Sequence, residues 1–304
     1  MDNRTLHVIR TTVFGTTAAG GNPCPIVFEA DQLSSAQMQR LAAGFGVETV
    51  FVLKPTRTGC DLRLRYFVPK HEMEMCGHAT VATVSVLAEH GRFHDSPVRV
   101  ETPLGALCAH WQHDPEGTLV TVEQFRPTFN HESPSVAEVS AALGVSEDAV
   151  ALDIAPIQSV SVSRSKLIIP LRERGALDSL RPDFERLWAL CDAYQTTGFY
   201  PFTIDSGNPY THAQARQFPK RAGYHEDPAT GVAACALGAY LVEHTVFGSK
   251  EGGWHNFQVE QGHAMGRPSV IRVAAKVAAD KIIRTRLGGR TWVLGEEDIV
   301  LAAA

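Results

Sequence analysis

The 304-residue sequence has no run of 18 apolar residues, which argues against a membrane-spanning helix. Its N-terminal stretch alternates like a strand and has no signal-peptide core. Lysine and arginine form no cluster, and the formal net charge is −5. We therefore expect neither nucleic acid nor a membrane as a partner.

Cysteine is scarce, and the six cysteines form no CxxC pair. Scattered single cysteines are typical of reduced thiols, which predicts a cytoplasmic location. The sequence also has no GxGxxG after a strand, no GxxxxGK[ST], no HExxH and no GxSxG. Nucleotide cofactors, zinc-protease chemistry and serine-hydrolase chemistry lose their usual support, and we expect no cofactor.

What the sequence does have is 44% hydrophobic residues, enough for a substantial core. Alternation with period 2 predicts strands, and apolar residues at helical spacing predict helices. Asp31 or Ser34 can cap the first helix. The predicted strands are 5–14, 49–55, 61–69, 159–171 and 267–277, and the predicted helices are 31–46, 135–144 and 183–193.

Two apolar segments repeat each other at a distance of 154 residues. GHATVATVSVLAEH (77–90) aligns with GVAACALGAYLVEH (231–244), and both end in Glu-His. A strand-like stretch with Phe and Pro precedes each segment, and a Val-Glu strand follows each. This order predicts two structurally similar halves.

The repeat also decides an ambiguity in the first segment. TVATVSV alone is β-branched and could be a strand, whereas the second segment is rich in Ala and Leu and favours a helix. If the halves correspond, both segments are helices, and each must be buried on all sides. Their N-termini, near Gly77 and Gly231, would then be natural sites for an anion.

The loops before these segments carry the candidate chemistry. Asp227 precedes Pro228 and is either an N-cap or a carboxylate of the site. His78 is either a donor to a substrate oxygen or a buried core histidine. Cys76 is either a thiol activated at a helix start or a small hydrophobic residue. A metal held by His71, Cys76 and His78 is disfavoured because no Cys/His pair lies elsewhere, so we predict no metal site.

Glu48 is a less obvious candidate. It interrupts an apolar run between a helix end and a strand, where an apolar residue would pack better. Such a charge is either capped and solvated or functional.

Five motifs together resemble the PhzF-like (phenazine biosynthesis) family, in order and spacing, over almost the whole chain. They are GGNPCPIVF (20–28), VETVFVL (47–53), RYFVPKHEMEMCGHAT (65–80), YHEDPATGVA (224–233) and QGHAMGRPS (261–269). The resemblance implies the α+β fold of the diaminopimelate-epimerase-like superfamily. In that fold each of two similar halves is a barrel-like sheet around a central helix, and the active site lies in the cleft between them. We predict an N-terminal half over 1–118, completed by strand 291–304, and a C-terminal half over 119–290.

The family's characterised activity is the cofactor-independent isomerisation of trans-2,3-dihydro-3-hydroxyanthranilate, and its members are commonly homodimers. The resemblance implies that Glu48 is the catalytic acid/base. Gly77, His78 and Asp227 also match the family's site. The predicted catalytic set is thus Glu48, Cys76, His78 and Asp227, and the predicted substrate- or anion-binding set is Asn22, Gly77, Thr230 and Gly231.

Two positions depart from the phenazine enzyme. Val232 stands where that enzyme has Ser, and Cys76 is a residue that it lacks. Cys76 matches one catalytic cysteine of the related amino-acid epimerases, but their second cysteine would fall near Pro228. Cys235 lies about two turns into its helix and is expected in the core.

Three functions follow as hypotheses. The first is a cofactor-independent isomerase that moves a proton and a double bond on a small carboxylate-bearing metabolite. The second is an epimerase or racemase that uses Cys76. The third is a non-catalytic small-molecule binding protein of the same fold, which the loss of the hydroxyl at Val232 favours.

Overall fold

The computed structural model describes residues 4–301 and divides the chain into two compact units. Unit 1 contains the described residues up to Glu123 together with those from Gly288 onward, and unit 2 is Gln124–Leu287. The sequence-based domain ranges, 1–118 with 291–304 and 119–290, stay a prediction.

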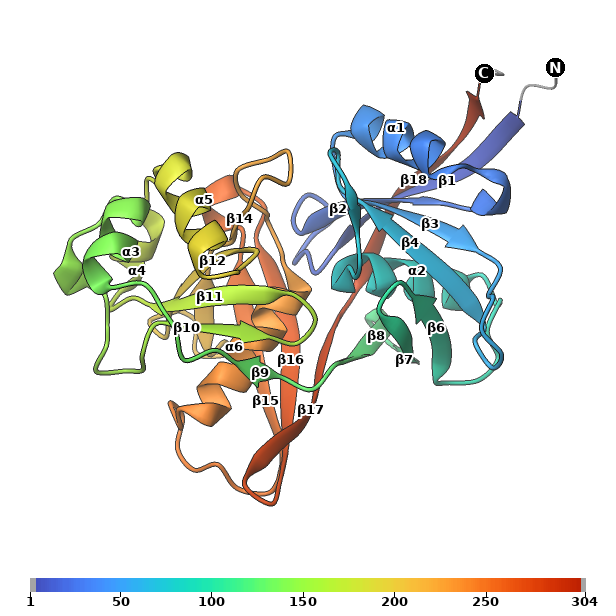
Figure 1. Cartoon of the computed structure of the whole chain (residues 1–304). Coiled ribbons are helices and arrows are strands. Elements are labelled where there is room, and N and C mark those ends of the chain that lie inside the picture. The colour runs from blue at the N-terminus through green and yellow to red at the C-terminus, as the bar shows by residue number, and fades with distance from the viewer. Residues whose placement is uncertain (1–3, 302–304) are drawn as a thin grey trace. The chain divides into compact units, whose positions relative to one another are not determined.

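Unit 1 consists of strands around the buried helix α2 (Gly77–Glu89), with α1 (Ser35–Phe45) outside them (Figure 1). Ser34 caps α1, and its hydroxyl accepts a hydrogen bond from the Gln37 amide. The remaining elements are β1 (Arg4–Val13), β2 (Asn22–Val27), η1 (Ala30–Gln32), β3 (Thr49–Leu53), β4 (Leu62–Phe67), β5 (Glu72–Met73), β6 (Val98–Thr102), β7 (Gly105–Asp114), β8 (Gly117–Gln124) and β18 (Thr291–Leu301).

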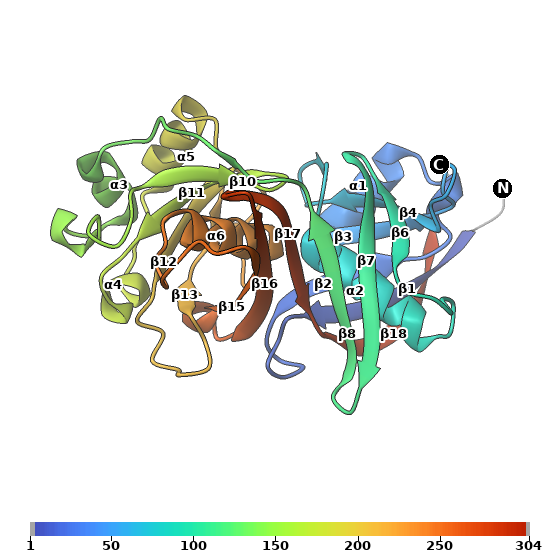
Figure 2. The same cartoon turned by 90° about the horizontal axis from the view of Figure 1, so that it is seen from below.

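Unit 2 repeats this plan around α6 (Gly231–Glu243), which Figure 2 shows enclosed by strands. Its outer helices are α3 (Val136–Leu143), α4 (Arg174–Asp178) and α5 (Phe184–Ala193). The remaining elements are β9 (Thr128–Phe129), η2 (Glu147–Ala149), β10 (Gln158–Ser161), β11 (Ser165–Pro170), β12 (Gly198–Thr203), β13 (Ala213–Ala215), β14 (Phe218–Pro219), β15 (Gly253–Gln261), η3 (His263–Met265), β16 (Ser269–Ala278) and β17 (Lys281–Gly289), whose last two residues belong to unit 1.

The strand pairing follows the same order in both units. In unit 1 the order is β18, β1, β2, β3, β4, β6, β7, and in unit 2 it is β9, β10, β11, β12, β13, β15, β16. In each series the third and the fifth pairs of neighbouring strands are parallel, namely β2–β3 and β4–β6 in unit 1 and β11–β12 and β13–β15 in unit 2. The other pairs in each series are antiparallel. The central helix lies in the chain between the two strands of the fifth pair. The internal repeat predicted from the sequence is therefore confirmed.

Both central segments are helices of 13 residues, beginning at Gly77 and Gly231 as predicted. All residues of α6 from Gly231 to Val242 are buried, and α2 is buried along most of its length. An added Cβ at Gly238 would lie 2.9 Å from Cγ2 of Val273. A residue without a side chain therefore lets α6 approach β16 this closely. Cys235 is 1% exposed, which confirms its expected place in the core.

One strand prediction was wrong. The range 159–171 is not a single strand but a hairpin of β10 and β11, with Ser161 opposite Ser165. The sequence alternates through Ser-Val-Ser-Arg-Ser without Gly or Pro, so the turn has no strong local signal.

A buried carboxylate fixes a loop of unit 1 and gives a pH-dependent prediction. Glu101 is 5% exposed and accepts hydrogen bonds from the Thr56 amide, the Thr56 hydroxyl and the Arg57 amide, at 2.6, 2.6 and 2.9 Å. Burial alone raises the pKa of Glu101, but these hydrogen bonds outweigh it, and the net pKa lies below the usual value. Its contribution to stability is present above the unfolded pKa and is lost as the pH falls through the folded one.

We expect Glu101→Gln to lower the free energy of unfolding at pH 7 by about 1–3 kcal/mol, because the amide cannot replace a charged acceptor. The difference in the free energy of unfolding between the variant and the original chain should shrink below about pH 4, where glutamate is protonated in the unfolded chain. Urea unfolding at both pH values measures this. Glu251→Gln, at an exposed position, is the control. A deficit that is equal at both pH values would contradict the explanation.

Candidate active site

Three side chains from two separate parts of unit 1 meet at the start of α2. Glu48 directly precedes β3, Cys76 is the N-cap of α2, and His78 lies in the first turn. The Cys76 Sγ lies 3.4 Å from Glu48 Oε2 and 3.3 Å from His78 Nδ1. His78 Nε2 lies 3.1 Å from the same Glu48 oxygen. Cys76 and His78, predicted from the loop before the first apolar segment, thus contact the predicted carboxylate of Glu48.

This cluster is largely shielded from solvent, and Glu48 is its most exposed member. Cys76 and His78 are 4% and 3% exposed, whereas 11% of the Glu48 side chain reaches solvent. Burial, and then the nearby Glu48 carboxylate, raises the pKa of the Cys76 thiol well above its usual value. Cys76 is therefore a protonated thiol that donates to Glu48 at neutral pH, not an activated thiolate.

Hydrogen bonds hold the first turn of α2 in place. The Thr80 hydroxyl donates its one hydrogen to the Cys76 carbonyl at 2.9 Å. In its 2.8 Å hydrogen bond with the buried Tyr66 hydroxyl, Thr80 is therefore the acceptor and Tyr66 the donor. The N-terminal end of a helix carries N–H groups and a positive partial charge. Gly77 and His78 lie at such an end and next to the Glu48 carboxylate, so the arrangement can move a proton beside a stabilised anion.

The other predicted residue of unit 1 is Asn22. It is buried at the start of β2 and lies opposite Val13 in the pairing with β1. The loop histidine of the disfavoured metal set, His71, is exposed.

The predicted residues of unit 2 form a second cluster, before α6. The Thr230 hydroxyl donates to Asp227 Oδ2, and both residues are buried. Thr230, not Asp227, is the N-cap of α6, and Pro228 lies before the helix. The N-cap interpretation of Asp227 was wrong because α6 begins only at Gly231, three positions later than an N-cap at Asp227 requires. Val232 is 7% exposed and lies in the first turn.

One buried residue organises this loop, and the sequence interpretation did not assign it to the site. Gln261 is 0% exposed. Its Oε1 accepts from the Thr230 amide at 3.1 Å and from the Tyr200 hydroxyl at 3.0 Å. Its Nε2 donates to the Asp227 carbonyl at 2.7 Å and to the Thr230 hydroxyl at 3.2 Å. The only sequence signal for Gln261 is the Gln-Gly pair at the start of the motif at 261–269. Its role could not be predicted, because its hydrogen-bond partners lie 31 to 61 positions away in the sequence.

The role of Tyr200 gives a modest prediction. Tyr200→Phe removes one hydrogen bond to Gln261 and leaves the ring in place, so we expect a loss of about 1 kcal/mol in the free energy of unfolding. Chemical denaturation measures this. Tyr210→Phe, at a ring that is 79% exposed, is the matched control and should change little. A Tyr200 variant as stable as the original chain would mean that this bond does not hold the loop.

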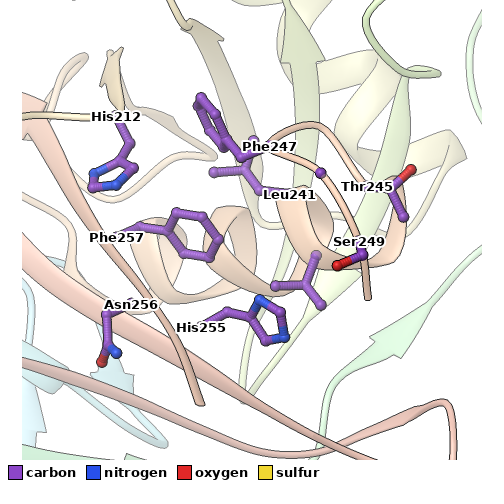
Figure 3. A pocket seen from close by; sticks show the side chains of 10 residues that line it. His212, Leu241, Thr245, Phe247, Ser249, His255, Asn256 and Phe257 are labelled. Carbon is purple, nitrogen blue, oxygen red and sulfur yellow. The ribbon is translucent and has the colours of Figure 1, made fainter. Parts of the chain in front are cut away.

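A hollow of about 210 Å³ lies elsewhere in unit 2, near the C-terminal end of α6. Figure 3 shows the rings of Phe247, Phe257, His212 and His255 around it. None of the predicted site residues lines this hollow.

Comparison with known proteins identifies the family of this chain. A family model described as "Phenazine biosynthesis-like protein" matches residues 11–296. The chain belongs to this family. An uncharacterized isomerase, YddE, of Escherichia coli O157:H7 is 33% identical over 95% of this chain and 96% of its own length. The trans-2,3-dihydro-3-hydroxyanthranilate isomerase of Pseudomonas chlororaphis is 30% identical over 97% of this chain and 99% of its own.

Solved structures agree with this family. The PhzF family protein of Bacillus anthracis superposes with a TM-score of 0.88 and 26% identity, covering 98% of this chain and 100% of that one. A hydroxyproline epimerase of Agrobacterium vitis has a TM-score of 0.69 at 12% identity, over 98% of this chain and 93% of that one, which shows the fold alone. The predicted α+β fold with two similar halves is confirmed.

Among the described residues, no helix combines the length and apolar character needed to cross a membrane.

Proposed function

We propose that this protein is an isomerase that moves a proton, and with it a double bond, on a small carboxylate-bearing metabolite without a cofactor. The observation that carries the proposal is the contact of Glu48 with His78 and Cys76 at the start of a buried helix. Relatives that match over nearly the whole chain are named isomerases, and this supports the same class of reaction here.

In the proposed reaction, the Glu48 carboxylate takes a proton from a carbon next to an activating group, and the C–H bond breaks. The electron pair moves into the conjugated system, and the double bond shifts. The protonated Glu48 then returns the proton to a different carbon, so no net oxidation occurs. His78, 3.1 Å from the carboxylate, orients it and donates to a substrate oxygen.

We also propose that the α6 start binds the substrate. Asp227 and Thr230 are fixed by Gln261, and a helix start at Gly231 suits a carboxylate or a developing enolate. Asn22 and Gly77 complete the proposed binding set. Val232 offers no hydroxyl where the phenazine enzyme has Ser, so we propose a substrate other than trans-2,3-dihydro-3-hydroxyanthranilate. The chain is further proposed to act as a homodimer, and its six free cysteines support a cytoplasmic location.

The test is a substrate panel. The protein is incubated with unsaturated amino and hydroxy carboxylates, including trans-2,3-dihydro-3-hydroxyanthranilate, and products are identified by NMR. We expect at least one compound to give an isomer of unchanged mass. Saturable binding of panel members with no isomer from any of them would instead support the non-catalytic binding protein.

One observation favours the epimerase as the second candidate, namely that Cys76 is a protonated thiol and so a ready acid. Because its Sγ contacts Glu48 Oε2 at 3.4 Å, the base on the other face would be a group other than Glu48. An epimerase needs an acid and a base on opposite faces of one carbon, and Cys76→Ser would then lose activity by a factor of about 10² or more. The proposed isomerase should lose less than about tenfold, because the Ser hydroxyl also donates to Glu48. The two losses, measured as kcat on the compound that the panel identifies, separate the candidates.

A further inference from the structure

The cluster at the start of α2 also has the geometry of a metal-binding face. The Glu48 Oε2, Cys76 Sγ and His78 Nε2 atoms form a triangle with edges of 3.1 Å (O to N), 3.4 Å (S to O) and 3.9 Å (S to N). The sequence disfavoured a metal because His71, Cys76 and His78 had no further partner. The fold supplies the missing ligand from Glu48, which is 28 positions before Cys76.

These edges match the ligand spacing of tetrahedral zinc. Zn²⁺ binds Cys sulfur at about 2.3 Å and His nitrogen or carboxylate oxygen at about 2.0–2.1 Å, which gives ligand-to-ligand distances of about 3.3 Å (O to N) and about 3.6 Å (S to O and S to N). Each observed edge lies within about 0.3 Å of its tetrahedral value. An ion could bind without a large movement of the three ligands.

The donor set and its surroundings also fit this ion. A thiolate, an imidazole and a carboxylate are ligands of borderline-soft Zn²⁺, and the two anions balance its charge. Cys76 and His78 are held by the start of α2, whose first turn is tied down through Thr80. The partly exposed Glu48 side chain gives the ion a route from solvent.

We propose that Glu48, Cys76 and His78 bind one Zn²⁺ ion, and that this ion inhibits the enzyme reversibly. On binding, the S–H bond of Cys76 breaks, its proton leaves to solvent, and sulfur, nitrogen and oxygen each donate a lone pair to the metal. The fourth position stays open for water or for an anionic ligand. Because the ion takes a lone pair of Glu48 Oε2 and withdraws charge from the whole carboxylate, Glu48 becomes too weak a base to take a proton from carbon.

Binding of the ion does not depend on the proposed function, whereas inhibition rests on it. The test therefore uses Co²⁺, which takes zinc's place and reports its ligands through absorption. Untagged protein, freed of metal with a chelator and then desalted, is titrated with Co²⁺ and afterwards with Zn²⁺. Circular dichroism of each variant shows whether it is folded.

We expect one equivalent of Co²⁺ to give the intense visible bands of a tetrahedral ion and a near-ultraviolet sulfur-to-cobalt band, both displaced by Zn²⁺. Cys76→Ser should lose the sulfur band and bind at least about tenfold more weakly. Cys60→Ser, at a partly exposed thiol of the same unit, is the matched control and should keep both. Weak octahedral bands in the original chain, or the same sulfur band in Cys76→Ser, would overturn the site.

The activity arm uses the substrate found in the panel. Micromolar Zn²⁺ should lower the rate, and a chelator should restore it. Zn²⁺ that binds with the expected spectrum but leaves the rate unchanged or raises it would overturn the inhibitory role and leave the metal site standing. A folded protein that shows the metal spectrum but no isomerase activity would count against the proposed function only.

Discussion

Glu48→Gln is expected to lower kcat for isomerisation by a factor of about 10²–10⁴, the range that a positioned general acid/base contributes. The amide keeps the size of the side chain and can still bond His78, but it cannot take a proton from carbon. KM should change much less than kcat, because the substitution removes proton transfer and leaves the binding groups in place. Steady-state rates measured by NMR on the substrate from the panel give both values.

The matched control is Glu74→Gln. Glu74 is an exposed carboxylate two positions before Cys76, so it tests whether a change of charge near the site matters by itself. We expect its kcat to stay within about twofold of the original chain, as for surface changes of small effect. A Glu74 variant as slow as the Glu48 variant would show that local charge, not proton transfer, explains the loss.

Arg216→Met is expected to lower the free energy of unfolding by about 3–5 kcal/mol, because it leaves the largely buried Glu226 carboxylate unpaired. Arg216 and Glu226 are joined by two hydrogen bonds, at 2.9 and 2.8 Å, and their side chains are only 9% and 15% exposed. The Arg216 Nη1 also donates to the carbonyl of Leu177 at 3.1 Å. The pair ties the loop that leads to Asp227 to the end of α4.

Chemical denaturation measures this loss of stability, and two further variants serve as controls. Arg216→Met combined with Glu226→Gln should recover part of the loss, because no unpaired buried charge remains. Arg186→Met removes the exposed ion pair with Asp183 and should cost no more than about 1 kcal/mol. Equal losses for Arg216→Met and Arg186→Met would contradict a special role for the buried pair.

The repeat was the part of the fold that the sequence predicted well. The segment at 77–90 alone did not distinguish helix from strand, but its alignment with 231–244 did, and both are helices with the predicted starts. A central helix must be apolar on all faces, and the Ala- and Leu-rich segment at 231–244 has this character most clearly. The turn between β10 and β11 has no such signature, and the predicted single strand there was wrong.

The candidate residues were found as separate signals, not as an arrangement. The motifs marked Glu48, Cys76 and His78, but nothing in the sequence gives the 3.1 Å between Glu48 and His78, which depends on how β3 and α2 pack. For the same reason the metal-binding geometry could not be foreseen. Gln261 was missed because a glutamine has no chemical signature, and its importance comes from the distant groups that it bonds.

The most direct test of the central claim is deuterium wash-in from D₂O, followed by NMR for the original chain and for Glu48→Gln. If Glu48 carries the proton, the original chain places deuterium at the receiving carbon of the product, because the protonated carboxyl exchanges with solvent. The Glu48→Gln variant should then incorporate deuterium at least about 10²-fold more slowly than the original chain, into either substrate or product. Incorporation by the variant at the rate of the original chain would contradict the account.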